Sequence, residues 1–185
     1  MKKIVLSFVM LLTALVAGAQ ELTNGVYEKK IVEKYDSVKA DVLYLRALEV
    51  LSDWAGSQEK SKVGIDVQDK ENGLIVYKGE YYMGFHKANF MAGWDVMAEF
   101  TLKIRCKDGR AQLTVTVPSM TFDWSAKRFP ATETIPISHL LPNYNHKSSL
   151  RIKKSALEFA PQVPSTFDSI LTAIANKMKA EVDDF

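Results

Sequence analysis

The chain has 185 residues, 47% hydrophobic and 25% charged, which suits one globular domain with a substantial hydrophobic core. A single cysteine excludes an intramolecular disulfide bond. The 24 Lys and Arg nearly balance the 22 Asp and Glu, whereas proteins that neutralise many phosphates carry a basic excess, so nucleic acid is not an expected partner.

Residues 1–19 have the organisation of a cleavable signal peptide. Lys2 and Lys3 precede an apolar run over residues 4–16, and Ala17-Gly18-Ala19 forms a small-residue cleavage site. A helix over this run would be about 20 Å long, short of the roughly 30 Å of a membrane core. We therefore expect a periplasmic or secreted chain without a membrane span after cleavage, the alternative being an uncleaved N-terminal anchor. Losing Lys2 and Lys3 leaves 22 basic residues against 22 acidic ones.

The mature chain, residues 20–185, is predicted to form one domain that begins with a strand over residues 26–35. Asp36 or Ser37 is the predicted N-cap of a helix that ends at about Ala55, before Gly56. Apolar residues recur at three- and four-residue steps, so this helix is expected to lie on a sheet. They are Val42, Leu45, Leu48, Val50, Leu51 and Trp54.

A hairpin is predicted next. Val63, Ile65 and Val67 alternate with polar residues, as in a half-buried strand. The Asn72-Gly73 pair is typical of a tight turn with two positive φ angles, after which a strand runs over residues 74–83. Residues 84–93 are predicted to be irregular.

The clearest pattern covers residues 96–117, where apolar and polar residues alternate on both sides of an Asp108-Gly109 turn. It predicts two antiparallel strands with one apolar and one polar face. The parity changes at Pro118-Ser119, so we predict a bulge or a bend there. The apolar set is Val96, Ala98, Phe100, Leu102, Ile104, Cys106, Ala111, Leu113, Val115 and Val117.

Residues 125–163 form a long segment that carries four prolines and little periodicity, and a short edge element is expected within residues 135–141. Ser165, with Asp168 three residues later, is predicted to open a last helix. One stripe of that helix is apolar: Phe167, Ile170, Leu171, Ile174 and Met178.

The predicted order is β-α-β-β-β-β-α, an α+β fold with two helices on one face of an antiparallel sheet. This order, the leader, the helix end Leu51-Ser52-Asp53-Trp54, the Gly73 hairpin and the turn at residues 106–110 resemble a family of exported bacterial domains of unknown function. The resemblance covers roughly residues 24–123 and implies a TATA-binding-protein-like (TBP-like) fold. It implies no catalytic residues, because the shared motifs are turns and core positions.

Two sets of residues are candidates for binding. The polar sheet face offers hydroxyl, amide and basic side chains: Thr101, Lys103, Arg105, Gln112, Thr114 and Thr116. An aromatic connection could form a hydrophobic lip for a ligand: Tyr82, Phe85, His86, Phe90 and Trp94. Ladders like the first set usually serve solubility and cross-strand pairing, and inward packing that caps the end of the core is the favoured explanation of the second.

Motifs for other chemistry are not indicated. The histidines at 86, 139 and 146 lack metal-ligand spacing, so no metal or cofactor is expected. There is no Gly-x-Ser-x-Gly elbow and no glycine-rich phosphate loop. Cys106 falls in the apolar register of a strand and is expected to be buried and inert.

The favoured hypothesis is a non-catalytic domain that binds an envelope protein or a small ligand through its open sheet face. One alternative is a small periplasmic hydrolase that acts on envelope or dietary polymer from beneath residues 125–163. The other is a structural subunit of an envelope assembly, which would form a stable oligomer.

Overall fold

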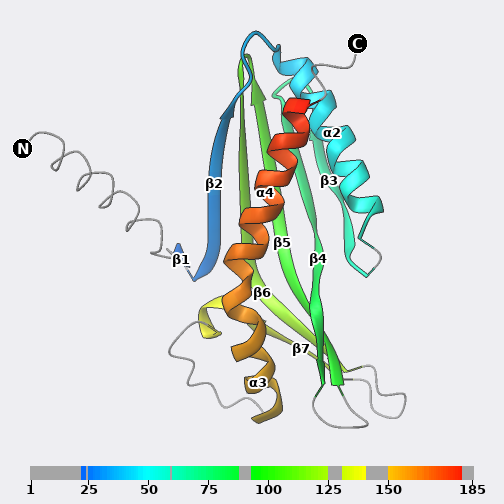
Figure 1. Ribbon diagram of the computed structural model, residues 1–185, viewed down its shortest axis with the longest axis vertical. Helices are drawn as coiled ribbons and strands as arrows, with labels where there is room; N and C mark the ends of the chain where they lie inside the picture. The colour runs from blue at the N-terminus through cyan, green and yellow to red at the C-terminus, as the bar shows by residue number, and fades with distance from the viewer. Residues whose placement is uncertain are drawn as a thin grey trace, which may run out of the picture.

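The protein is a two-layer α+β structure, in which helices cover one face of an antiparallel sheet (Figure 1). The computed structural model describes residues 22–23, 25–58, 60–87, 93–124, 131–140 and 150–180, so the predicted signal peptide lies outside the described residues. The strands are β1 (Leu22–Thr23), β2 (Val26–Lys34), β3 (Lys62–Asp69), β4 (Leu74–Lys87), β5 (Gly93–Lys107), β6 (Arg110–Trp124) and β7 (Ala131–Pro136). The helices are α2 (Ala40–Gly56), α3 (Leu150–Phe159) and α4 (Val163–Ala180), with 3-10 turns η1 (Ile137–His139) and η2 (Ala160–Gln162).

The strand order is β1-β2-β6-β5-β4-β3, and β7 also pairs with β6. The two halves of β6 have different partners, because Tyr27 of β2 lies opposite Val117 while Pro136 of β7 lies opposite Ser119. The β5–β6 register slips at the same point, where Glu99 and Thr101 face Ser119 and Thr116. The bulge predicted at Pro118 is confirmed. It lies at the point where the pairing partner of β6 changes from β2 to β7.

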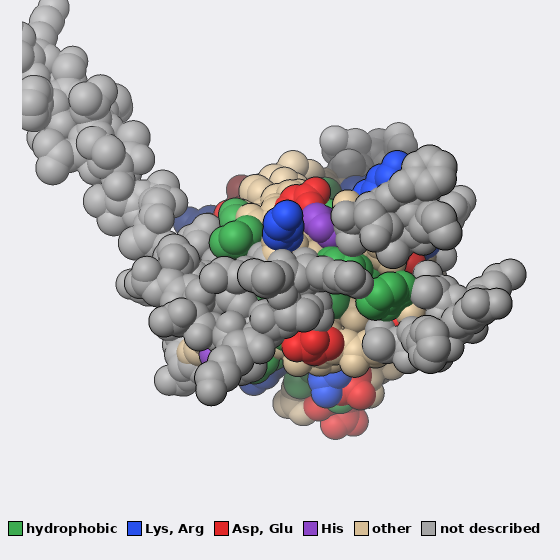
Figure 2. All heavy atoms as spheres, turned by 90° about the horizontal axis from the view of Figure 1, so that it is seen from below, with side chains coloured by type: hydrophobic (Ala, Val, Ile, Leu, Met, Phe, Trp, Pro, Cys, Tyr) green, Lys and Arg blue, Asp and Glu red, His purple; other side chains and the backbone are tan. Residues whose placement is uncertain are grey.

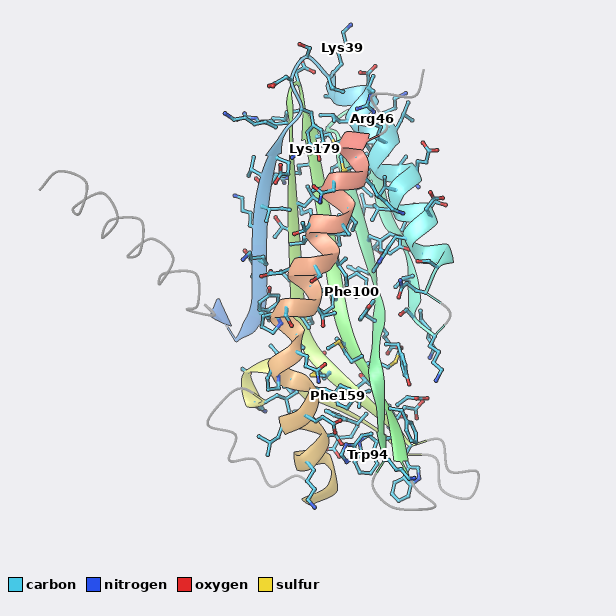
Figure 3. The ribbon with its side chains drawn as sticks, viewed as in Figure 1. Lys39, Arg46, Trp94, Phe100, Phe159 and Lys179 are labelled. Carbon is cyan, nitrogen blue, oxygen red and sulfur yellow. The ribbon has the colours of Figure 1, made fainter. Side chains whose placement is uncertain are left out.

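The predicted apolar face of β5 and β6 is the centre of the core. Every residue of that set is at most 3% exposed. Phe100 lies between the two long helices, with its ring 5.8 Å from Trp54 of α2 and 5.5 Å from Phe167 of α4 (Figure 3). Both predicted helices therefore pack on the same face of the sheet, as the predicted α+β class requires.

The predicted apolar face of α2 is wrong in part. Val42 and Leu45 are 38% and 54% exposed, whereas Val50 and Leu51 of the predicted set are buried together with Leu43, Tyr44 and Ala47. This helix has apolar residues on two sides, so spacing alone does not show which side meets the sheet. Ile65 and Val67 are also 40% exposed, because β3 is an edge strand.

The helix start was also predicted incorrectly. The N-cap of α2 is Lys39, and the Ala40 N–H donates to Asp108 Oδ1 at 2.8 Å, so the cap comes from the β5–β6 turn. The backbone of the same turn bonds the β2–α2 connection, through Tyr35 N–H to Gly109 O at 2.9 Å and Gly109 N–H to Val38 O at 2.8 Å. The turn therefore fixes the direction in which α2 leaves the sheet.

The long proline-bearing segment contains more structure than the sequence predicted. The expected edge element is confirmed as β7 and η1, with Ile135, Ile137 and Leu140 buried. Helix α3 was not predicted, and α4 begins at Val163, so Ser165 is not its cap. Asp168 instead accepts a hydrogen bond from Tyr27 Oη at 2.9 Å, which joins α4 to β2.

The Asn72-Gly73 turn is longer than predicted, because Asp69 pairs with Leu74 and leaves four residues between the strands. Of these four residues, Gly73 alone has a positive φ, +60°. The Cys106 N–H donates to Gly73 O at 2.8 Å, and a Cβ on Gly73 would lie 2.4 Å from Cys106 O. Glycine is required there by both conformation and space.

Replacing Asp108 with Ala is expected to lower the free energy of unfolding by about 1 kcal/mol, because the first N–H of α2 loses its acceptor. Urea denaturation would measure the change. Asp36→Ala is the matched control, since Asp36 is exposed and does not form the cap. Equal losses in the two variants would contradict the assignment of the cap to Asp108.

Gly73→Ala is expected to destabilise the protein by about 2 kcal/mol or more, since it adds positive-φ strain to a clash with the β5 backbone. Gly64→Ala, on the same hairpin, has open space around its Cβ and should stay within about 0.5 kcal/mol of the parent. Thermal unfolding of both variants tests the requirement, and a tolerated Gly73→Ala would refute it.

Candidate binding face

The six polar-face candidates occupy neighbouring positions on the central strands of the sheet. Their register places Thr101 opposite Thr116, Lys103 opposite Thr114 and Arg105 opposite Gln112. All six alternate with the buried core residues of β5 and β6, so they lie on the face away from the helices. The sequence reasoning grouped these residues correctly, and their role remains a prediction.

The pairing of β2, β6 and β5 places four further cations on this face, none of which the sequence singled out. Lys34 lies opposite Arg110, which lies opposite Lys107, while Lys30 lies opposite Thr114. The alternation of Glu28, Lys30, Val32 and Lys34 was present in the sequence, but nothing there places β2 beside β6. We use the name basic patch for Lys30, Lys34, Lys103, Arg105, Lys107 and Arg110.

The basic patch fills three cross-strand rows at the turn end of the sheet. From the turn, these rows read Lys34–Arg110–Lys107, then Val32–Gln112–Arg105, then Lys30–Thr114–Lys103. On β2, β6 and β5 these rows contain six cations and no acid. Glu28, the first acid on this face of β2, belongs to the next row, and Asp69 of β3 lies in the Arg105 row beyond Leu74 of β4. Like charges in directly opposite positions destabilise a sheet, so stability does not account for the first row.

Charges on the other face of β2 are arranged differently. Lys29 pairs with Asp168 at 3.3 Å, and Glu33 pairs with Lys179 at 2.6 Å, so both charges on that face meet a partner on α4. Within the described part of the chain, none of the six patch cations forms an ion pair. On β2, the cations of the basic patch, Lys30 and Lys34, are therefore exposed to solvent without an acidic partner among the described residues.

A small hollow lies within the patch. It has a volume of about 240 Å³ and is lined by Val32, Arg105, Lys107, Arg110 and Gln112. Val32 is 53% exposed, so its side chain offers an apolar surface beside three cations and one amide. A second, more open depression reaches over the turns, where the acids Glu71 and Asp108 line it together with Lys70, Lys107 and Arg110.

The aromatic candidates do not form one lip. Strand β4 continues to Lys87, past a register shift near Gly84, so the predicted irregular stretch is wrong for residues 84–87. Residues 88–92 lie outside the described residues. Trp94 is 3% exposed, donates from Nε1 to the Ser155 hydroxyl and stacks on His86 at 5.1 Å, on the side of α3. Phe85 is 52% exposed.

The remaining aromatic candidates are separated from this group. The Tyr82 ring lies under Lys60 Nζ at 4.4 Å and pairs across the sheet with Met97, on the face away from Trp94. Phe90 lies outside the described residues. Figure 2 shows this end of the molecule, where hydrophobic, basic and acidic side chains are interspersed among the described residues that are visible.

The His86 ring lies close to an acid, with Nδ1 2.5 Å from Glu158 Oε2. In the described residues, no group of three or more His, Cys, Asp and Glu side chains is placed to hold a metal ion. None of the described helices is long and apolar enough to cross a membrane.

Comparison with known proteins identifies a family and a fold. A family model for a domain of unknown function with a TBP-like fold, DUF4468, matches residues 27–121. The chain belongs to the DUF4468 family. The whole basic patch lies within the matched segment of this DUF4468 domain, whereas α3 and α4 lie beyond it. No curated protein matches the sequence.

Two crystal structures share the fold. A DUF4468 family protein from Bacteroides ovatus aligns with a TM-score of 0.64 at 12% identity, covering 88% of this chain and 91% of that one. A TBP-like protein from Parabacteroides distasonis aligns with a TM-score of 0.59 at 10% identity, covering 86% and 96%. These likenesses confirm the TBP-like architecture predicted from the sequence, and at such identities they show the fold alone.

The predicted burial of Cys106 is confirmed, since its side chain is 3% exposed. Burial raises the pKa of the Cys106 thiol to about 11, so only about one molecule in a thousand carries the thiolate at pH 8. We expect a thiol reagent at pH 8 to modify the native protein far more slowly than the urea-unfolded protein. Equal rates in the two states would show that the β5 end opens readily.

Proposed function

We propose that this DUF4468 domain is exported and works without catalysis, binding a partner in the bacterial envelope through the open face of its sheet. The observation that carries the proposal is the basic patch, six cations in three rows without an acid among them. The organisation of residues 1–19 as a signal peptide supports export to the periplasm or beyond.

The energetics of the sheet support a functional rather than a structural role for these cations. Repulsion among Lys34, Arg110 and Lys107 opposes folding, whereas an anionic partner would neutralise it on binding. Surface cations that serve solubility alone are usually interspersed with acids. The patch lacks them, although the same strand places Glu33 on its other face.

The Lys103→Ala/Arg105→Ala variant tests the proposal. The immobilised mature chain should retain less envelope material than the parent, with a melting temperature unchanged or slightly raised, because no described ion pair is lost. Quantified capture from an envelope extract and thermal unfolding are the two measurements.

Lys62→Ala/Lys78→Ala is the matched control, because it removes the same charge. Lys62 pairs with Glu80 at 3.7 Å and Lys78 pairs with Asp66 at 2.8 Å, so both cations already have acidic partners. Capture should survive in this control. Unchanged capture by the Lys103→Ala/Arg105→Ala variant, or an equal loss in the control, would refute the proposal.

A further inference from the structure

We propose that the partner of the basic patch is an anionic polysaccharide, one acidic sugar unit of which occupies the hollow beside Arg105 and Arg110. This inference rests on the proposed binding function and adds the chemistry of the ligand.

The spacing favours a ligand with several negative groups. Strands lie about 4.8 Å apart and side chains on one face recur about every 6.8 Å, so the six cations share an area of about 10 Å by 14 Å. That is close to the Debye length of about 8 Å at physiological salt, so their fields add. A single carboxylate would neutralise a small part of this charge, whereas a polyanion lying along β5 would meet Lys103, Arg105 and Lys107 in turn.

The hollow suits one unit of such a polymer. Its volume of about 240 Å³ is below the 300–1,000 Å³ typical of pockets that enclose a whole small ligand. Arg105 and Arg110 carry guanidinium groups, which bind a carboxylate or sulfate with two parallel hydrogen bonds. Val32 offers an apolar contact for the C–H face of a sugar ring, and Gln112 can both donate to and accept from its hydroxyls.

The residues between the cations favour a ligand that carries hydroxyl groups. Next to Glu28, in the row beyond the patch, lie Thr116 and Thr101, while Gln112 and Thr114 lie between the cations themselves. Each of these threonine and glutamine residues has a side chain that exchanges hydrogen bonds with hydroxyls as well as with water. A polymer of acidic sugars has both kinds of group that this surface can bind, the anions and the hydroxyls.

Other macromolecules fit the patch less well. Stable protein interfaces are usually anchored by a buried aromatic or large apolar side chain. The basic patch itself offers only Val32, and the other apolar side chains on this face, Leu74, Val76 and Val67, lie beyond it on β4 and β3. Single-stranded nucleic acid is usually held by aromatic side chains on which bases stack, and the rows contain none.

Isothermal titration of the mature protein with defined polymers tests the inference. The probes are polygalacturonate and heparin as acidic polysaccharides, dextran as a neutral one, poly-L-glutamate as an acidic polypeptide and single-stranded DNA. We expect an acidic polysaccharide to bind more tightly than the polypeptide or the DNA, dextran to fail, and affinity to fall as salt rises.

Variants locate the site. Arg105→Ala/Arg110→Ala should weaken the binding of the acidic polysaccharide by about tenfold or more, and Arg105→Lys/Arg110→Lys should recover part of the loss, since lysine keeps the charge without the paired hydrogen bonds. Lys62→Ala/Lys78→Ala should stay within about twofold of the parent, because those cations are already paired. Circular dichroism would establish that each variant is folded.

Each outcome has one meaning. Equal or tighter binding of poly-L-glutamate or DNA would overturn the inference in favour of an acidic polypeptide or a nucleic acid, and patch-dependent dimerisation seen by light scattering would overturn it in favour of a second copy. Absence of polymer binding, with envelope capture still dependent on Lys103 and Arg105, would overturn this inference and leave the proposed function standing. If neither polymer binding nor envelope capture depended on the patch residues, both the polysaccharide inference and the proposed function would be overturned.

Discussion

The structure depends on the burial of one face of β5 and β6 beneath two helices. Phe100 is at the centre of this contact, since its ring meets Trp54 of α2 and Phe167 of α4, so one side chain of the sheet joins both helices to the core. Each fully buried side chain of this size contributes roughly 1.5–3 kcal/mol before entropy is subtracted. Because side chains alternate along a strand, covering one face of β5 and β6 places Lys103, Arg105 and Thr114 on the other.

Two turns at the same end of the molecule fix the positions of the strands that carry the basic patch. The Asp108-Gly109 turn caps α2 and bonds the β2–α2 connection, and Gly73 is bonded to the backbone of β5. Helix α4 is held to β2 by Tyr27, Lys29 and Glu33, which all contact it from the core side. The strands that carry the basic patch are thus fixed from behind, so their outward side chains keep a constant spacing.

The sequence was most informative where one strand pattern was long and regular. The alternation over residues 96–117 predicted both central strands, their faces, the buried Cys106 and the bulge at Pro118, because a period of two leaves only one way to bury the apolar set. Helix α2 was harder, since Val42 and Leu45 are as apolar as Leu43 and only tertiary contacts select the buried side.

The candidate site could be predicted only in part, for a topological reason. Thr101, Lys103, Arg105, Gln112, Thr114 and Thr116 belong to one hairpin, whose pairing is local, so the sequence placed them together. Lys30 and Lys34 reach the patch because β2 pairs with a strand that is more than 70 residues away along the chain. Helix α3 is amphipathic in sequence, and it was missed because the prolines around it led the whole of residues 125–163 to be interpreted as one irregular segment. The aromatic residues divided between two faces because β4 continues past Gly84.

The central claim is that the cations of the open face oppose folding rather than assist it. The most direct measurement is the free energy of unfolding of the Lys34→Ala/Lys107→Ala variant relative to the parent, at low and at high salt. If Lys34 and Lys107 repel Arg110, the variant should be at least as stable as the parent at low salt, and this advantage should fade as salt screens the repulsion. A variant that is less stable than the parent by the same amount at every salt concentration would show that these lysines hold the sheet together, and would contradict the account.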